Sequence, residues 1–124
     1  MKILIVDDSE IIRKRLKVML SEITELENIS QAEDVPEAIS SFQKINPEVV
    51  ILDIRMPGGS GIDVLQEIKK GNQPPLVIVL TNYPYPQYRR KCMGAGADFF
   101  FDKSTEFDKV TEVLKQLKQN QSRQ

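Results

Sequence analysis

Histidine and tryptophan are absent from this chain of 124 residues, and Cys92 is its single cysteine. Histidine is the most common metal ligand and general base among side chains, so its absence excludes Ser-His and Cys-His nucleophilic chemistry. One cysteine cannot form an internal disulfide, and a structural zinc site is not expected. A metal ion in this protein would have to be a hard, oxygen-bound cation such as Mg2+ or Mn2+.

The chain also lacks long apolar segments and an excess of charge of either sign. No apolar stretch approaches the roughly 20 residues that span a bilayer, and the start Met-Lys-Ile-Leu lacks the apolar region of a signal peptide. With 17 basic and 18 acidic residues, charge gives no argument for binding nucleic acid or a membrane. We therefore expect one cytoplasmic domain that contacts neither nucleic acid nor a membrane directly.

Short apolar runs that end abruptly in polar groups are the most informative feature present. Continuous apolar runs are typical of strands buried on both faces of a parallel sheet. The carboxyl ends of such strands lie at one edge, where open α/β sheets bind ligands. We therefore expect the groups that follow the runs to meet there. They are Asp7 and Asp8 after 3–6, Asp53 after 49–52, Thr81 after 77–80, and Asp102 and Lys103 after 99–101.

Segments with apolar residues at helical spacing separate these runs, at 12–23, 38–45, 62–68 and 107–117. Capping residues indicate starts at Ser9 for the first of these helices, at Ser60 for the third and at Ser104-Thr105 for the last. A short helix is also expected from Pro86 to Met93. Strand and helix thus alternate five times, which predicts helices on both faces of a parallel sheet.

Two segments are more polar than the rest. The segment 29–33 has the composition of a half-solvated edge strand rather than a central one. Residues 1–119 are expected to form the domain. Residues 120–124 are polar and fit either a natural terminus or the start of a linker.

The acidic residues at the predicted edge require a cation. Two carboxylates about 4 Å apart repel by about 4 kcal/mol at an effective dielectric near 20, so crowding Asp7, Asp8 and Asp53 is costly without a divalent cation. A metal ion, an ammonium group and a hydroxyl together suit a phosphoryl group. Asp53 is the candidate nucleophile because it stands alone after a central strand. Each residue taken singly could be a cap, a turn residue or a surface charge, but the set favours function.

Four motifs occur in a specific order: Val6-Asp7-Asp8, Leu52-Asp53-Ile54-Arg55-Met56-Pro57, Leu80-Thr81, and Gly94-Ala95-Gly96-Ala97-Asp98 followed by Lys103. With them, nearly the whole chain resembles the receiver domain of two-component response regulators. The resemblance implies a doubly wound, flavodoxin-like (βα)5 fold whose five-stranded parallel sheet has the order 2-1-3-4-5. It also implies a signalling module and not an enzyme, with at most self-phosphorylation from a phosphodonor and autodephosphorylation.

The resemblance implies roles for the acidic residues. Asp53 would accept a phosphoryl group from a sensor histidine kinase or a histidine phosphotransfer protein. Mg2+, or Mn2+, would be held by Asp8, Asp53 and the backbone carbonyl of Arg55, with Asp7 acting through water. Because the chain has no histidine, the phosphodonor histidine must belong to another molecule.

The resemblance also implies a switch. Lys103 and the Thr81 hydroxyl would hold the phosphoryl oxygens. Thr81 would move toward the phosphate and Phe100 would follow, which changes the face made by the fourth helix, fifth strand and fifth helix and controls a partner protein. Phe100 also fits ordinary core packing. The module would act as a monomer or a phosphorylation-dependent dimer.

Several positions depart from the common receiver pattern. Ser104 follows Lys103 where many receivers have proline, so the cis peptide common there is not required. Arg55, Asn82 and Tyr83 flank the expected phosphoryl position, and we expect them to tune the lifetime of the phosphorylated state.

Other functions are compatible with part of the pattern. The chain could be the N-terminal receiver of a longer regulator with an effector domain. A magnesium-dependent phosphatase that forms an aspartyl phosphate is less favoured, because Asp7-Asp8 lacks the Asp-x-Asp spacing of such enzymes and no length is spare for a cap. A flavodoxin-like cofactor binder is disfavoured because the carboxylates would repel a flavin phosphate.

Overall fold

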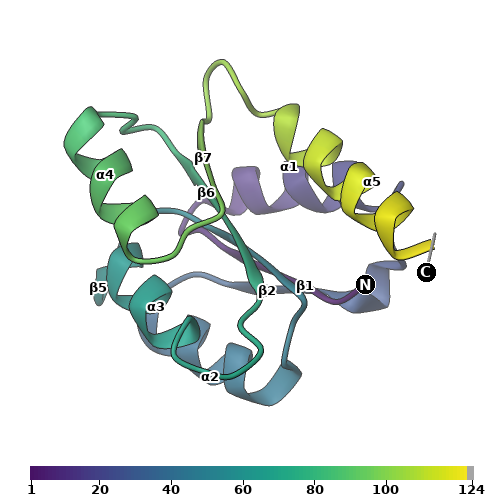
Figure 1. Ribbon diagram of the computed structural model, residues 1–124, viewed down its shortest axis with the longest axis horizontal. Coiled ribbons are helices and arrows are strands. Elements are labelled where there is room, and N and C mark those ends of the chain that lie inside the picture. The colour runs from purple at the N-terminus through teal and green to yellow at the C-terminus, as the bar shows by residue number, and fades with distance from the viewer. Residues whose placement is uncertain (123–124) are drawn as a thin grey trace.

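Five parallel strands form one central sheet (Figure 1). The computed structural model describes residues 1–122. The order of the strands across the sheet is β2 (Ile29–Ala32), β1 (Ile3–Val6), β3 (Val49–Leu52), β6 (Leu76–Thr81) and β7 (Phe99–Asp102). Since β6 and β7 are the fourth and fifth strands of this sheet along the chain, the predicted order 2-1-3-4-5 is confirmed. The polar strand β2 lies at an edge, as predicted.

The register of the sheet brings the strand ends together. Val6 pairs with Leu52, and Leu52 with Val79. In the pair formed by β6 and β7, Thr81 pairs with Asp102, and both are the last residues of their strands. All these pairs are parallel, so the residues that follow β1, β3 and β7 emerge on one edge.

Helices cover both faces of the sheet, as predicted (Figure 1). Helices α1 (Glu10–Leu20) and α5 (Lys109–Ser122) pack on one face through residues that include Leu16, Leu20, Val110 and Leu114. Helices α2 (Val35–Ile45), α3 (Gly61–Ile68) and α4 (Pro86–Gly94) pack on the other. Both faces of the central strands are therefore buried, which explains their unbroken apolar sequences. Within residues 1–122, no helix is long and apolar enough to span a membrane.

The predicted caps at two helix starts are confirmed. The Ser9 hydroxyl accepts a hydrogen bond from Ile12 N at 3.3 Å. Ser60 and Asp63 form a capping box at the start of α3. Helix α4 also occupies the predicted position, from Pro86 to Gly94. The starts of α1 and α3 were predictable because short polar side chains satisfy backbone groups locally, and the start of α4 was predictable because proline suits the first turn of a helix.

The predicted start of the last helix at Ser104-Thr105 is wrong, since α5 begins at Lys109. The Ser104 backbone N and Oγ both donate to Asp102 Oδ1, at 2.9 and 2.7 Å. Asp102 N donates in turn to Glu106 Oε1 at 3.1 Å. These bonds stabilise a turn that competes with the first helical turn. Asp102, the last residue of β7, thus stabilises the turn that follows it, and the Lys103-Ser104 peptide bond is trans.

Two short elements were not predicted. Residues Leu26–Asn28 form a 3-10 turn before β2. Strands β4 (Arg55–Met56) and β5 (Gly59–Ser60) form an antiparallel hairpin after Asp53. Pro57 and Gly58 make its turn, and Gly58 and the adjoining strand residue Gly59 have φ values of 82° and 141°, which favour glycine.

Gly61 allows α3 to start directly against the end of β3. Its N donates to Ile54 O at 2.6 Å. A Cβ at this position would clash with the Asp53 carbonyl oxygen and would lie 2.9 Å from both the Asp53 carbonyl carbon and Ile54 Cα. The close approach therefore fixes the backbone of Asp53 relative to α3.

We predict that Gly61→Ala destabilises the protein by about 2–3 kcal/mol, because backbone atoms must move to admit the methyl group. Gly71→Ala is the matched control, since nothing lies within 4 Å of a Cβ there, and it should change stability by less than about 0.5 kcal/mol. Urea unfolding measures both. Equal effects of the two substitutions would contradict the close packing at Gly61.

Candidate functional site

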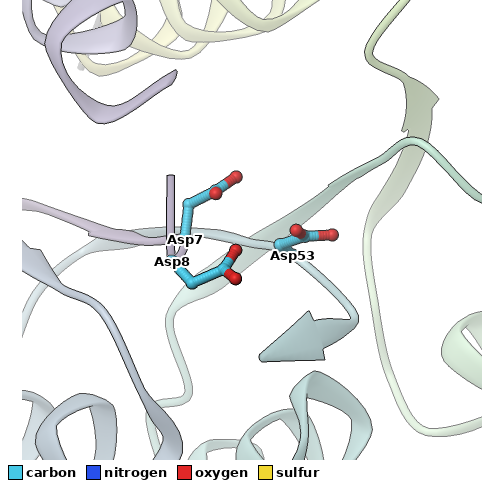
Figure 2. Close-up of side chains that lie close together, drawn as sticks. All are labelled: Asp7, Asp8 and Asp53. Atoms are coloured by element: carbon cyan, nitrogen blue, oxygen red, sulfur yellow. The ribbon is translucent and has the colours of Figure 1, made fainter. Parts of the chain in front are cut away.

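Three carboxylates lie together at the carboxyl edge of the sheet. Asp7 and Asp8 follow β1 and Asp53 follows β3, and one carboxylate oxygen from each lies within 4.8 Å of the others. Figure 2 shows the three side chains projecting from these strand ends. Asp7 and Asp53 are buried, with 3% and 6% exposure, whereas Asp8 is exposed. The cluster is thus half enclosed, with Asp8 on its solvent side.

Lys103 is the counterion of the two buried carboxylates. It follows β7 and is 7% exposed. Its Nζ lies 2.6 Å from Asp7 Oδ2 and 3.1 Å from Asp53 Oδ2. Asp53 Oδ1 also accepts a hydrogen bond from Ile54 N at 2.7 Å, and Asp7 Oδ1 accepts one from Ser9 N at 2.9 Å. Two buried carboxylates therefore share one ammonium group.

Burial and charge shift the acid–base equilibria of this group. Burial raises the pKa of Asp53 above its ordinary 3.8, the positive charge of Lys103 opposes that shift, and the negative charge of Asp7 adds to it. Burial alone would lower the pKa of Lys103, but its hydrogen bond and attraction to Asp7 and Asp53 outweigh burial and raise it above 10.5. Lys103 is therefore an ammonium group at neutral pH.

The acidic cluster fits a hard divalent cation. Its possible ligands are carboxylate oxygens, and the chain has no histidine. A cluster with few protein ligands and one exposed carboxylate leaves room for the water molecules that Mg2+ retains. One ammonium does not neutralise three carboxylates, so the local charge also favours a cation.

Thr81 ends β6 and Phe100 lies on the neighbouring strand β7. The buried Thr81 hydroxyl accepts a hydrogen bond from Tyr83 N at 2.9 Å. In the described part of the chain, the Thr81 side chain has no hydrogen bond to Asp53 or Lys103. Phe100 is 3% exposed and packs in the core under α4. Its carbonyl accepts a hydrogen bond from Arg89 Nη2 at 3.2 Å, and the Arg89 guanidinium lies 5.1 Å from its ring.

The positions expected to tune the site differ in their surroundings. Arg55 is exposed, and its guanidinium stacks at 3.9 Å on the ring of half-buried Tyr83. Arg55 Nη2 also lies 3.4 Å from the Tyr88 hydroxyl. Asn82 is exposed. The sequence reasoning missed Tyr88 and Arg89, although an aromatic residue within an otherwise polar helix was a usable signal for Tyr88.

The protein is thus a doubly wound α/β domain whose half-enclosed acidic cluster and lysine lie at the carboxyl edge of the sheet, where open α/β sheets bind ligands. The chain belongs to the response regulator receiver domain family, whose pattern matches residues 3–115. It is therefore a receiver domain of the two-component response regulators.

Individual relatives agree with this assignment. The chain is 33% identical to the chemotaxis protein CheY of Halobacterium salinarum over 91% of its length and 96% of that protein. It is 29% identical to the sensory transduction protein LytT of Bacillus anthracis, over 100% of this chain and 50% of that protein. The chain thus spans about half the length of some curated relatives it matches.

Solved structures show the same fold. The N-terminal domain of an uncharacterized protein from Wolinella succinogenes superposes with a TM-score of 0.86, at 31% identity, over 98% of this chain and 96% of that one. The chemotaxis protein CheY4 of Vibrio cholerae gives a TM-score of 0.81, at 25% identity, over 93% of this chain and 96% of that one.

We predict that Lys103→Met lowers stability by about 3–5 kcal/mol at neutral pH, because it leaves two buried carboxylates without a counterion. Lys109→Met is the matched control: its ion pair with Glu106 is more exposed and should contribute at most about 1 kcal/mol. Urea unfolding in the presence of a chelator measures both. A loss below about 1 kcal/mol for Lys103→Met would contradict the shared ion pair.

The raised pKa of Asp53 predicts a pH dependence. The pKa of Asp53 lies above 3.8 in the folded protein, so the folded state binds this proton more tightly than the unfolded chain does. The stability gained from this proton is fully present below pH 3.8 and is lost as the pH rises through the folded-state pKa. Asp53→Asn cannot ionise, so its stability relative to wild type should increase over that interval. Urea unfolding between pH 3.5 and 7 with a chelator tests this, and a relative stability that falls with pH would contradict it.

Proposed function

We propose that this receiver domain accepts a phosphoryl group on Asp53 from a histidine kinase or a histidine phosphotransfer protein. The observation that carries the proposal is the buried Lys103 ammonium, which lies within 3.1 Å of Asp53 and 2.6 Å of Asp7 at the carboxyl edge. A positive charge fixed at this point would stabilise the phosphoryl oxygens as negative charge develops on them. Membership of the receiver family supports the same assignment.

The proposed reaction transfers the phosphoryl group between two side chains. A carboxylate oxygen of Asp53 forms a bond to phosphorus, and the bond from phosphorus to the donor's imidazole nitrogen breaks. The electron pair of that bond stays on the departing nitrogen. This chain supplies the carboxylate nucleophile and positions it through the bond from Ile54 N to Asp53 Oδ1. After transfer, Lys103 and Thr81 hold the phosphoryl oxygens.

The metal is proposed to be Mg2+, or Mn2+, held by Asp8, Asp53 and the Arg55 carbonyl, with Asp7 acting through water. The exposure of Asp8 supports its role as a direct ligand. Lys103 Nζ lies closer to Asp7, at 2.6 Å, than to Asp53, at 3.1 Å, which supports the indirect role of Asp7. When bound, the metal supplies positive charge that offsets the carboxylates and the phosphoryl oxygens.

The proposed output is a contact with a downstream protein. Thr81 leaves its bond to Tyr83 N, Phe100 responds, and the face formed by α4, β7 and α5 changes its affinity for that partner. The chain would act as a monomer or a phosphorylation-dependent dimer. A receiver within a longer regulator is the second candidate, because LytT of Bacillus anthracis is twice the length that the match covers.

We predict that the protein gains one phosphoryl group from a small acyl phosphate in the presence of Mg2+, as measured by intact mass. A chelator should suppress the gain, and Asp53→Asn should abolish it. Asp102→Asn is the matched control: Asp102 also ends a strand, but its carboxylate accepts bonds from Ser104, so this variant should be modified like wild type.

Two results would count against phosphoryl acceptance as the function of this domain. Wild-type protein that stays unmodified both by the acyl phosphate and by a panel of phosphorylated histidine kinases would refute phosphoryl acceptance. Rapid turnover of unrelated phosphate esters would instead favour the phosphatase alternative.

A further inference from the structure

Arg55 joins segments that surround the acidic cluster. It lies two residues after Asp53, and its guanidinium carbon is 3.9 Å from the centroid of the Tyr83 ring. Its Nη2 is 3.4 Å from the hydroxyl of Tyr88 on α4. A planar guanidinium can stack on a ring and donate a hydrogen bond from its edge at the same time. We call Arg55, Tyr83 and Tyr88 the clasp.

The clasp is connected to the hydroxyl that is proposed to hold the phosphoryl group. Tyr83 N donates to Thr81 Oγ1 at 2.9 Å. In the proposed switch, the Thr81 hydroxyl leaves this bond as it moves toward the phosphoryl group on Asp53. The clasp holds the Tyr83 ring against Arg55 and therefore opposes that movement.

Helix α4 has few apolar contacts that would fix it independently of the clasp. Cys92 is the one residue of α4 that is buried, whereas α3 buries five, which are Gly61, Ile62, Val64, Leu65 and Ile68. Segments with few buried apolar contacts open locally at low cost in free energy. Polar contacts such as those of Tyr88 and Arg89 therefore carry weight in positioning this helix.

We infer that Tyr88 is a positioning residue for the Asp53 site, and that the clasp couples the position of α4 to phosphoryl occupancy by a route separate from Phe100. This inference rests on the proposed function. Because the clasp keeps Thr81 at Tyr83 N, it favours the arrangement in which Thr81 does not contact a phosphoryl group. Coupling of this kind is reciprocal. A variant that loosens α4 must therefore raise the affinity of the Asp53 site for a phosphoryl group, by the same factor by which a bound phosphoryl group loosens α4.

The test uses the full chain, Mg2+ and fluoroberyllate as the probe of phosphoryl occupancy. Calorimetry gives the fluoroberyllate affinity, and hydrogen exchange gives the opening of α4 amides. Tyr88→Phe removes one hydroxyl. Tyr85→Phe is the matched control, since Tyr85 lies at the start of the same helix, 5.9 Å from the Tyr88 ring, and its hydroxyl has no hydrogen bond within residues 1–122.

We expect Tyr88→Phe to tighten fluoroberyllate binding roughly two- to ten-fold, the factor that the net contribution of one hydrogen bond supplies. Exchange of α4 amides without fluoroberyllate should accelerate by a similar factor. Arg55→Lys, which keeps the charge without the planar fork, should give an intermediate change, and Tyr85→Phe should change neither quantity. A role in helix stability alone would accelerate exchange and leave the affinity unchanged.

Unchanged or weaker binding in a folded Tyr88→Phe variant would overturn the inference. If wild type binds fluoroberyllate, Asp53→Asn does not, and Tyr88→Phe binds like wild type, the inference fails and the proposed function stands. If wild type fails to bind fluoroberyllate and is not phosphorylated, both fail.

Discussion

Two buried carboxylates, Asp7 and Asp53, depend on one buried ammonium, that of Lys103. Moving a charged group out of water costs several kcal/mol even in a relaxed protein, so each carboxylate requires the ammonium and the ammonium requires the carboxylates. One ammonium cannot neutralise two carboxylates and the adjacent Asp8. The remaining negative charge is the physical reason why the acidic cluster favours a divalent cation.

The fold holds this unfavourable arrangement in place with its best packed parts. The central strands β1 and β3 are fully buried, and their parallel register sets Asp7 beside Asp53. Gly61 brings α3 directly against the Asp53 backbone. Tyr83, in the loop after β6, and helix α4 are held by polar and aromatic contacts that include those of Arg55 with Tyr83 and Tyr88 and of Arg89 with Phe100. The backbone of Asp53 is therefore held more tightly than helix α4.

The sheet order, the edge position of β2 and the meeting of the carboxylates with Lys103 were predictable from the sequence, because buried parallel strands have continuous apolar runs and share one carboxyl edge. The start of α5 was not predictable, because the Asp102 carboxylate accepts hydrogen bonds from both the backbone N and the Oγ of Ser104 and thereby stabilises a turn. The contacts of Arg55 with Tyr83 and Tyr88 were not predictable either. They depend on where α4 packs, and α4 has too weak an apolar stripe to indicate which side faces the sheet. The bond from Tyr83 N to Thr81 is similarly a property of the folded loop.

We propose that Asp53 accepts a phosphoryl group beside the charged side chains of Asp7, Asp8 and Lys103, which follow two other strands of the sheet. A crystal structure of the protein with Mg2+ and fluoroberyllate tests it most directly. We expect beryllium bonded to Asp53, fluorine atoms in contact with Lys103 Nζ and Thr81 Oγ1, and Mg2+ bound by Asp8, Asp53 and the Arg55 carbonyl. Fluoroberyllate bound away from Asp53, or Lys103 still bridging Asp7 and Asp53 with no contact to fluorine, would contradict it.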